Sequence, residues 1–167
     1  MPINSNSVAL AGEFAVLSQL ALRGYDANLT LGNTKAVDIL LADPGTGGMF
    51  KLEVKTSRKQ PQHSRMFGYT LGWPMHEKHE AISDSRLFYV FANFDIDNQN
   101  RFRFFIVPSA EVAHYVQDQH RRWLQADPTH KDQPLRTFRI GVGKPEEYPI
   151  PTPLASEYED AWTFESR

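Results

Sequence analysis

Apolar and charged side chains alternate strictly over residues 50–55, which is the pattern of a strand with one buried face. Residues 87–94 instead form a continuous apolar run, typical of a strand covered on both faces. In residues 7–23, apolar residues including Leu10 and Phe14 recur at helical spacing. The whole pattern predicts a helix over 7–23, strands over 25–31, 36–42 and 49–56, a short helix over 76–83, strands over 87–94 and 101–107, a helix capped by Ser109, and a strand over 135–142.

A hairpin is predicted where residues 43–48, rich in turn-forming residues, join the strands over 36–42 and 49–56. If the loop closes over these residues, antiparallel pairing sets Asp38 opposite Glu53, with Cβ atoms about 4.5–5.5 Å apart. Facing carboxylates destabilise a sheet, so a positive charge is expected between them. Lys55 and a divalent cation are equally suitable candidates.

The segment Glu53-Val54-Lys55 carries the most suggestive chemistry, because residues two apart on a strand share a face. A carboxylate there can hold a hard divalent cation, and a lysine can orient a water molecule or offset a developing charge. Glu13 in the first helix is a weaker candidate, since a glutamate in a helix is more often an ordinary solvated carboxylate. The histidines of the segment 76–80 are three residues apart, which does not fit the zinc motif with four-residue spacing.

Basic residues gather beside this segment, whereas the C-terminal part of the chain is acidic. Residues 51–65 contain five Lys or Arg residues and one acid, and residues 146–165 contain six acids and no Lys or Arg. The aperiodic stretch 57–75 also contains Phe67 and Trp73, and basic residues with aromatics are typical of nucleic-acid surfaces. The alternative is a loop whose aromatics fold into the core.

Composition favours a soluble cytoplasmic protein. The chain has 167 residues, a net charge of −2 and no cysteine. It contains no apolar run long enough for a membrane helix and no signal peptide at its start, so no membrane partner is expected. One domain over residues 1–143 is predicted, followed by a proline-rich, acidic arm over 144–167 that packs on the domain or on a partner.

The order of elements and of acidic residues resembles the PD-(D/E)XK nuclease superfamily, which includes restriction endonucleases and Holliday-junction resolvases. The resemblance implies an α/β fold with a restriction-endonuclease-like αβββαβ core, a mixed central sheet flanked by helices. It implies that Asp38, Glu53 and the backbone carbonyl of Val54 hold Mg²⁺ or Mn²⁺. Lys55 would assist the attacking water. Glu13 would match the first-helix acid of resolvase-like members and would be a further catalytic residue and metal ligand. Val37 stands where the motif's name has proline.

The expected function is therefore a metal-dependent endonuclease that hydrolyses DNA phosphodiester bonds. Many relatives cut two strands with two subunits, so a homodimer is compatible with the resemblance. Two other functions remain open: a nuclease-fold module that binds nucleic acid or a protein without turnover, and a structural protein in which the acids and Lys55 form a salt-bridge cluster. The expected contacts to nucleic acid are Lys51, Arg58, Lys59 and Arg65.

Overall fold

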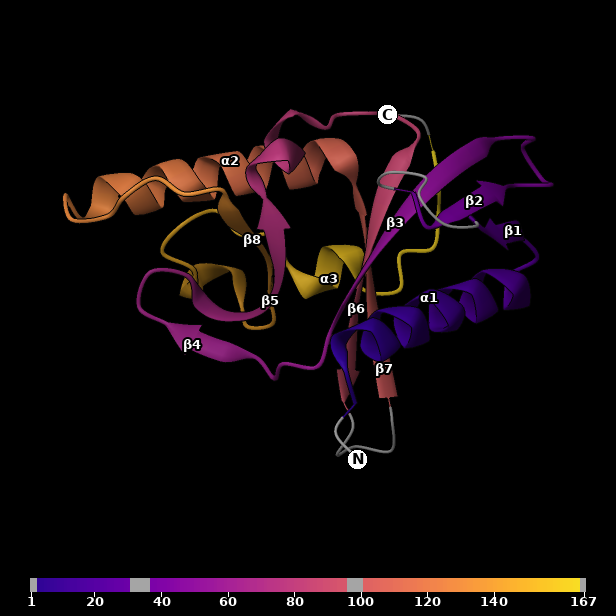
Figure 1. Ribbon diagram of the computed structural model, residues 1–167, viewed down its shortest axis with the longest axis horizontal. Coiled ribbons are helices and arrows are strands. Elements are labelled where there is room, and N and C mark those ends of the chain that lie inside the picture. The colour runs from indigo at the N-terminus through magenta and orange to yellow at the C-terminus, as the bar shows by residue number, and fades with distance from the viewer. Residues whose placement is uncertain (1–2, 31–36, 96–100, 166–167) are drawn as a thin grey trace.

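A five-stranded mixed sheet forms the centre of the protein (Figure 1). The computed structural model describes residues 3–30, 37–95 and 101–165. The strand order is β1-β2-β3-β6-β7; β3 and β6 run parallel, and the other neighbours are antiparallel. The bounds are β1 Asp26–Leu29, β2 Ile39–Ala42, β3 Met49–Ser57, β6 Leu87–Asp95 and β7 Arg101–Pro108. Together with its flanking helices, this sheet confirms the predicted mixed α/β architecture.

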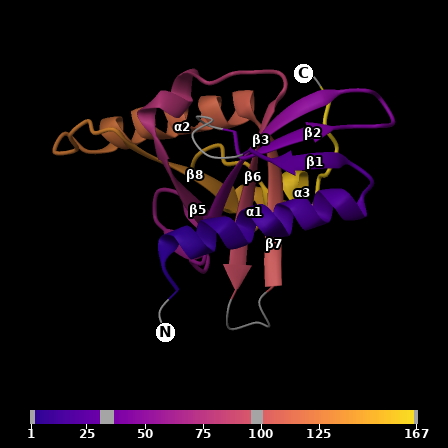
Figure 2. The same cartoon turned by 45° about the vertical axis from the view of Figure 1, so that its right-hand side comes forward.

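A smaller antiparallel sheet of three strands, in the order β4-β5-β8, packs beside the large one (Figures 1 and 2). A 3₁₀ helix follows β5, and the longest helix on this side of the molecule precedes β8. The bounds are α1 Ser5–Leu22, β4 Gln62–Ser64, β5 Gly68–His76, η1 Glu77–Ala81, α2 Ser109–Ala126, β8 Leu135–Gly141, η2 Pro145–Glu147 and α3 Ala155–Tyr158. Among the described residues, none of the helices combines the length and the apolar character needed to cross a bilayer.

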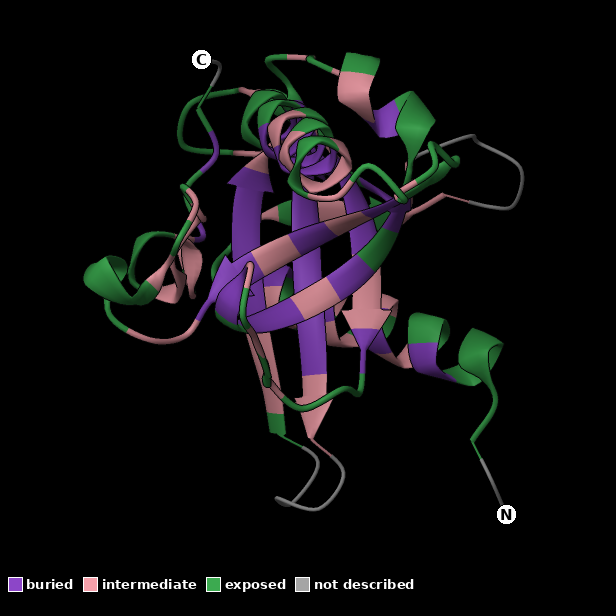
Figure 3. Ribbon diagram, turned by 90° about the vertical axis from the view of Figure 1, so that its left-hand side faces the viewer, coloured by how far each residue is buried: buried purple, intermediate pink, exposed green. Residues whose placement is uncertain are grey.

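Two hydrophobic cores lie on opposite faces of the large sheet, and β6 contributes to both because its successive side chains alternate between faces. Phe88 and Val90 face α1, while Tyr89 and Phe91 face α2 and the small sheet. The burial map shows this central position as continuous burial along the middle strands (Figure 3). The apolar run in β6 is therefore explained by cover on both sides, as its pattern predicts.

The hairpin register agrees with the sequence prediction. Ile39 pairs with Leu52, and Ala42 pairs with Met49, so the loop closes over residues 43–48. β1 and β2 are shorter than the predicted strands and span Asp26–Leu29 and Ile39–Ala42. Residues 25, 30, 37 and 38 lie outside them, and residues 31 and 36 fall outside the described residues. This register brings Asp38, the residue before β2, alongside the middle of β3.

The first helix is oriented differently from the apolar pattern of Leu10 and Phe14, whose side chains are 49% and 53% exposed. The buried residues are instead Val8, Gly12, Val16 and Leu20. Apolar residues surround most of this helix, so periodicity alone selects no single face. Close packing selects it: a Cβ atom at Gly12 would lie 1.8 Å from Oγ1 of Thr56, so only glycine allows α1 to approach β3 this closely.

The aperiodic stretch 57–75 is not a loop, because β4 and most of β5 lie within it. Gly68, Gly72 and Pro74 interrupt the alternation that would have revealed β5. Trp73 is fully buried, and its indole Nε1 donates a hydrogen bond to the carbonyl oxygen of Ala92 at 3.0 Å. The alternative in which the aromatics enter the core therefore holds for Trp73.

Contrary to the prediction, Ser109 does not cap α2, because it is the first helical residue and Pro108 takes the cap position. Its buried hydroxyl accepts a hydrogen bond from the backbone N–H of Asp84 at 2.9 Å and donates one to the carbonyl oxygen of Asp84 at 2.8 Å. This serine thus ties the start of α2 to the turn before β6. A tertiary contact has replaced the local cap.

The segment after β8 runs back across the molecule. Leu154 bridges to Gly141, and Glu159 bridges to Phe105 of β7. Trp162 and Phe164 are buried in the core beneath α1. Their burial accounts for the aromatic residues near the end of an otherwise acidic segment.

Candidate active site

The β2–β3 hairpin holds the carboxylate of Asp38 against the middle of β3. The backbone N–H of Asp38 donates to the carbonyl oxygen of Leu52 at 2.8 Å, and Oδ2 of Asp38 accepts from the N–H of Val54 at 2.7 Å. Asp38 thus bonds to the residues on either side of Glu53. These two backbone contacts fix the position of the Asp38 carboxylate against β3.

Glu53 is 4% exposed and is the most buried acid of the site. Its Oε1 lies 2.5 Å from Nζ of Lys55 and 3.7 Å from Nε2 of His79. Its Oε2 is buried and makes no hydrogen bond within the described part of the chain. A buried carboxylate oxygen without a partner is costly, so this oxygen is available to a ligand that supplies positive charge or a donor.

The carboxylates of Glu13, Asp38 and Glu53 are electrostatically coupled. Burial raises the pKa of Asp38, and the charge of Glu53 raises it further, against the effects of the Val54 N–H and Lys55. Burial also raises the pKa of Glu13, and the charge of Asp38 adds to the rise. The acids predicted from three different elements are therefore close enough to repel one another.

Glu53 behaves differently from the other acids. Burial favours its neutral form, but the His79 ring and the Lys55 ammonium outweigh burial and hold its pKa below the ordinary value. Glu53 therefore stays ionised in the site, whereas the pKa values of Asp38 and Glu13 are raised by burial and by the charge of a neighbouring carboxylate. A cation bound near Asp38 would offset the repulsion between these carboxylates.

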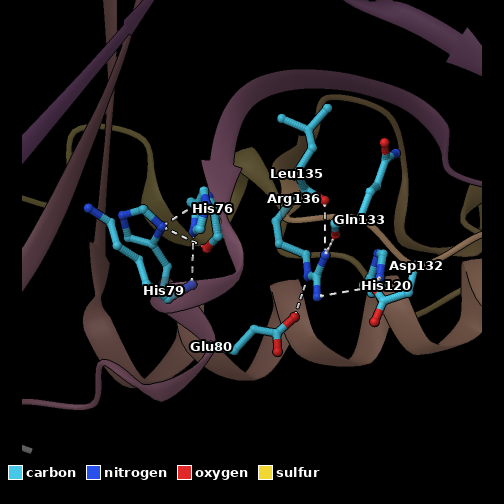
Figure 4. Close-up of polar contacts among 9 residues, drawn as sticks. His76, His79, Glu80, His120, Asp132, Gln133, Leu135 and Arg136 are labelled. Atoms are coloured by element: carbon cyan, nitrogen blue, oxygen red, sulfur yellow. Dashed lines mark hydrogen bonds and ion pairs between the residues drawn. The ribbon is translucent and has the colours of Figure 1, made fainter.

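His79 reaches the site from η1 and was not predicted there, although its segment was correctly predicted to be a short helix (Figure 4). Its Nδ1 lies 3.0 Å from the backbone nitrogen of His76 and 2.8 Å from the backbone oxygen of that residue. The same short helix is tied to β8 by the ion pair between Glu80 and Arg136. These contacts hold the ring so that Nε2 points toward Glu53.

Tyr89 is the second unpredicted neighbour of Glu53, and the two residues are partners in the parallel β3–β6 register. Its hydroxyl is buried and makes no hydrogen bond to the described residues, and the same holds for Nε2 of His79. Burial and the charge of Glu53 raise the pKa of Tyr89, so the hydroxyl stays protonated. The Tyr89 hydroxyl and the His79 ring therefore both act on the buried carboxylate of Glu53. No local sequence signal marks Tyr89, because it lies within an apolar run.

The predicted nucleic-acid contacts divide into two groups. Lys51 is engaged in an ion pair with Asp84 and is less available for a ligand. Arg58, Lys59 and Arg65 are exposed on the segment that leaves β3 and on the β4–β5 turn. Within the described residues, none of these three forms an ion pair with an acid. They provide local positive charge beyond the end of β3.

The residues present fit a hard divalent cation with few protein ligands. No group of three or more His, Cys, Asp or Glu side chains in the described ranges is arranged to hold a metal ion by itself. Mg²⁺, however, is usually held by one or two carboxylates together with water and substrate phosphates. The carboxylate oxygens of Asp38 and Glu53 are donors of the type that Mg²⁺ takes, and Oδ2 of Asp38 lies against the backbone of Val54.

The mixed sheet with helices on both sides defines an α/β fold. Among solved structures, the chain is similar to that of a bacterial homing endonuclease, I-Ssp6803I, with 13% sequence identity and a TM-score of 0.52. The match covers 95% of this chain and 88% of the endonuclease chain. No protein-family model matches the chain, and no curated protein matches its sequence. At this identity, the likeness establishes a shared fold.

Proposed function

We propose that the protein is a metal-dependent endonuclease that hydrolyses phosphodiester bonds in DNA. The observation that carries the proposal is the coupled set of Glu13, Asp38 and Glu53, which are far apart in sequence. Lys55 adjoins this set, and one buried Glu53 oxygen has no partner in the described structure. The fold shared with a homing endonuclease supports the same conclusion.

Each residue then has a distinct role. Asp38 and Glu53 supply carboxylate oxygens to Mg²⁺ or Mn²⁺, the Val54 carbonyl completes the protein ligands, and Glu13 adds negative charge from α1. A bound Mg²⁺ or Mn²⁺ would lower the pKa of the attacking water and offset charge on the phosphate oxygens. Lys55, held at Glu53, orients that water or stabilises the charge that develops on the phosphate.

Cleavage of a supercoiled plasmid and of a linear duplex in Mg²⁺ tests the proposal. Glu53→Gln and Lys55→Met preserve size while removing charge, and each is expected to lower the cleavage rate by about a hundredfold or more. Glu146→Gln is the matched control, because Glu146 is an exposed acid of η2 outside the site. Its rate should equal that of the wild type. Full activity in both site variants, with folding confirmed by circular dichroism, would refute the assignment.

A protein that binds without turnover is the second candidate function. It is favoured by the ion pair of Lys55 with Glu53, which already balances the more buried charge, and by the absence of a ready-made metal centre within the described residues. Calorimetric titration with Mn²⁺ separates the two candidates. The nuclease should bind Mn²⁺ and lose that binding in Asp38→Asn. A wild-type protein that binds duplex DNA but neither Mn²⁺ nor Mg²⁺ would favour the second candidate.

A further inference from the structure

A hollow of about 400 Å³ lies on the small sheet. We call it the β8 groove. It lies between the β4–β5 hairpin and the outward-facing residues of β8, and its polar and aromatic lining includes Lys59, Gln62, His63, Phe67, Thr137 and Arg139. Its lining contains no Asp or Glu, although the protein has a net charge of −2.

Arg139 is the unusual member of this groove. Its guanidinium stacks on the Phe67 ring, with Cζ 3.9 Å from the ring centroid. Its Nη1 is buried without a hydrogen-bond partner, and no carboxylate among the described residues forms an ion pair with it. Burial lowers the pKa of Arg139, but an arginine remains charged in a folded protein. A partly buried positive charge without a counter-ion is energetically costly.

The nearest polar neighbour does not balance this charge. The Tyr115 hydroxyl adjoins the guanidinium, but burial raises the pKa of Tyr115 to about 12, so the hydroxyl is neutral at physiological pH. Arg136, which also lies on β8, is by contrast a buried arginine whose charge is balanced by an acid. It pairs with Glu80 and donates to the carbonyl oxygen of Leu135 at 3.1 Å (Figure 4).

An anion is the ligand that completes the groove. A stacked guanidinium is held in one orientation, and its planar set of donors matches the oxygens of a phosphate. Lys59 and His63 add donors at the rim, and the rest of the lining is uncharged, with amides, hydroxyls and apolar side chains. A second hollow shares Lys59 with the groove and reaches Thr56 and Ser57 at the end of β3. A strand of nucleic acid lying along both hollows would pass the end of the strand that carries Lys55.

We propose that the β8 groove binds a backbone phosphate of a nucleic-acid strand, with Arg139 as its fixed cation. This assignment rests on the proposed nuclease function in one respect only, namely that the phosphate belongs to DNA. The groove would add a contact on the small sheet, away from the candidate active site. It would position the strand without taking part in the cleavage chemistry.

Fluorescence anisotropy of a labelled duplex of about 30 base pairs, measured in EDTA at several salt concentrations between about 50 and 200 mM, tests the groove. Arg139→Gln is expected to weaken binding about tenfold, and the slope of log affinity against log salt should fall by about one phosphate contact. Arg139→Lys retains the charge but loses the planar donors, so its affinity should fall between those of the wild type and Arg139→Gln.

Arg23→Gln is the matched control, because Arg23 also stacks on an aromatic ring, that of Trp162, but lies outside the groove. It should bind like the wild type. Lys59→Gln tests the rim independently of any effect of Arg139 on folding, with an expected loss of about two- to fivefold. Unchanged affinity and salt slope in both Arg139→Gln and Lys59→Gln would overturn the proposal, as would a wild-type protein that does not bind the duplex.

Two further measurements separate the source of the phosphate and the fate of each proposal. If calorimetry shows Arg139-dependent binding of inorganic phosphate while duplex affinity is unaffected by Arg139→Gln, the groove is a free-phosphate site and the nucleic-acid assignment fails. Arg139-dependent duplex binding without any Mg²⁺-dependent cleavage supports the groove and refutes only the nuclease. Cleavage by a protein whose duplex binding does not depend on Arg139 or Lys59 supports the nuclease and refutes only the groove.

Discussion

Gly12→Ala tests how α1 is seated on β3, because the new methyl group has no space. It would lie 1.8 Å from Oγ1 of Thr56 and 2.9 Å from its Cβ. Rotation about χ1 moves Oγ1 away but leaves Cβ in place, so the helix or the strand has to shift. Overpacking of this kind costs about 1–3 kcal/mol. Replacing a helical glycine with alanine otherwise gains about 1 kcal/mol. The expected net result is a loss of up to about 2 kcal/mol in unfolding free energy.

A double-mutant cycle with Thr56→Ala isolates this contact. The Thr56 hydroxyl is buried without a hydrogen-bond partner in the described structure, so its removal breaks no bond. The single change should cost at most about 1 kcal/mol for the lost methyl group. In the double variant, the methyl group added to the helix would enter the space left by the threonine atoms, so the two changes should be coupled by about 1–2 kcal/mol.

Urea unfolding monitored by tryptophan fluorescence measures all four proteins of the cycle. The reasoning is refuted if Gly12→Ala is more stable than the wild type by about 1 kcal/mol, as an exposed helical glycine would be. Additive effects in the double variant would also refute it. Because Glu13 follows Gly12, a displaced helix should also lower Mg²⁺-dependent cleavage, and Thr56→Ala should restore that activity along with stability.

The remaining predictions concern pH and the C-terminal segment. Burial raises the pKa of Asp38 in the folded state, so its stability contribution is greatest when it is protonated and is lost as pH rises through that pKa. In EDTA, Asp38→Asn should therefore exceed the wild type in stability at about pH 7 and match it near pH 3; an equal gain at both would contradict the assignment. Trp162→Ala should cost about 3–5 kcal/mol in urea unfolding, whereas Leu22→Ala, at a 77% exposed position, should change stability by less than about 0.5 kcal/mol. Gly68→Ala and Gly47→Ala both place alanine at a φ of +70°, but only the Cβ atom at Gly68 meets another side chain, the ring of Tyr148 at 2.7 Å. Gly68→Ala should therefore lower the melting temperature more than Gly47→Ala. Equal decreases would argue against the contact with Tyr148.

The hairpin was predictable because its information is local. The turn-forming residues 43–48 and the alternation on both sides determine the register, and the register places Asp38 beside Glu53. The fold class was predictable for a related reason. The continuous apolar run of β6 requires cover on both faces, and a sheet covered by helices provides it.

The orientation of α1 and the presence of β5 could not be derived in the same way. α1 is apolar on more than one side, so the choice between Val16 and Phe14 as the buried side chain depends on how closely the helix approaches β3. In β5, glycine and proline residues hide the alternation, and the strand becomes evident only through its pairing with β8. Both features are decided by packing partners that are distant in the sequence.

The candidate site shows the same division. The chain alone determined the chemical types and their local spacing: a carboxylate and a lysine two residues apart on β3, opposite an acid across a tight hairpin. Only the tertiary structure brought His79 and Tyr89 to Glu53, because a parallel strand pair and a 3₁₀ helix after β5 join segments that share no local pattern. It also left Arg139 without a counter-ion among the described residues, because charge balance depends on every side chain around the guanidinium. Local patterns follow from backbone geometry, whereas burial and charge balance depend on the whole packed molecule.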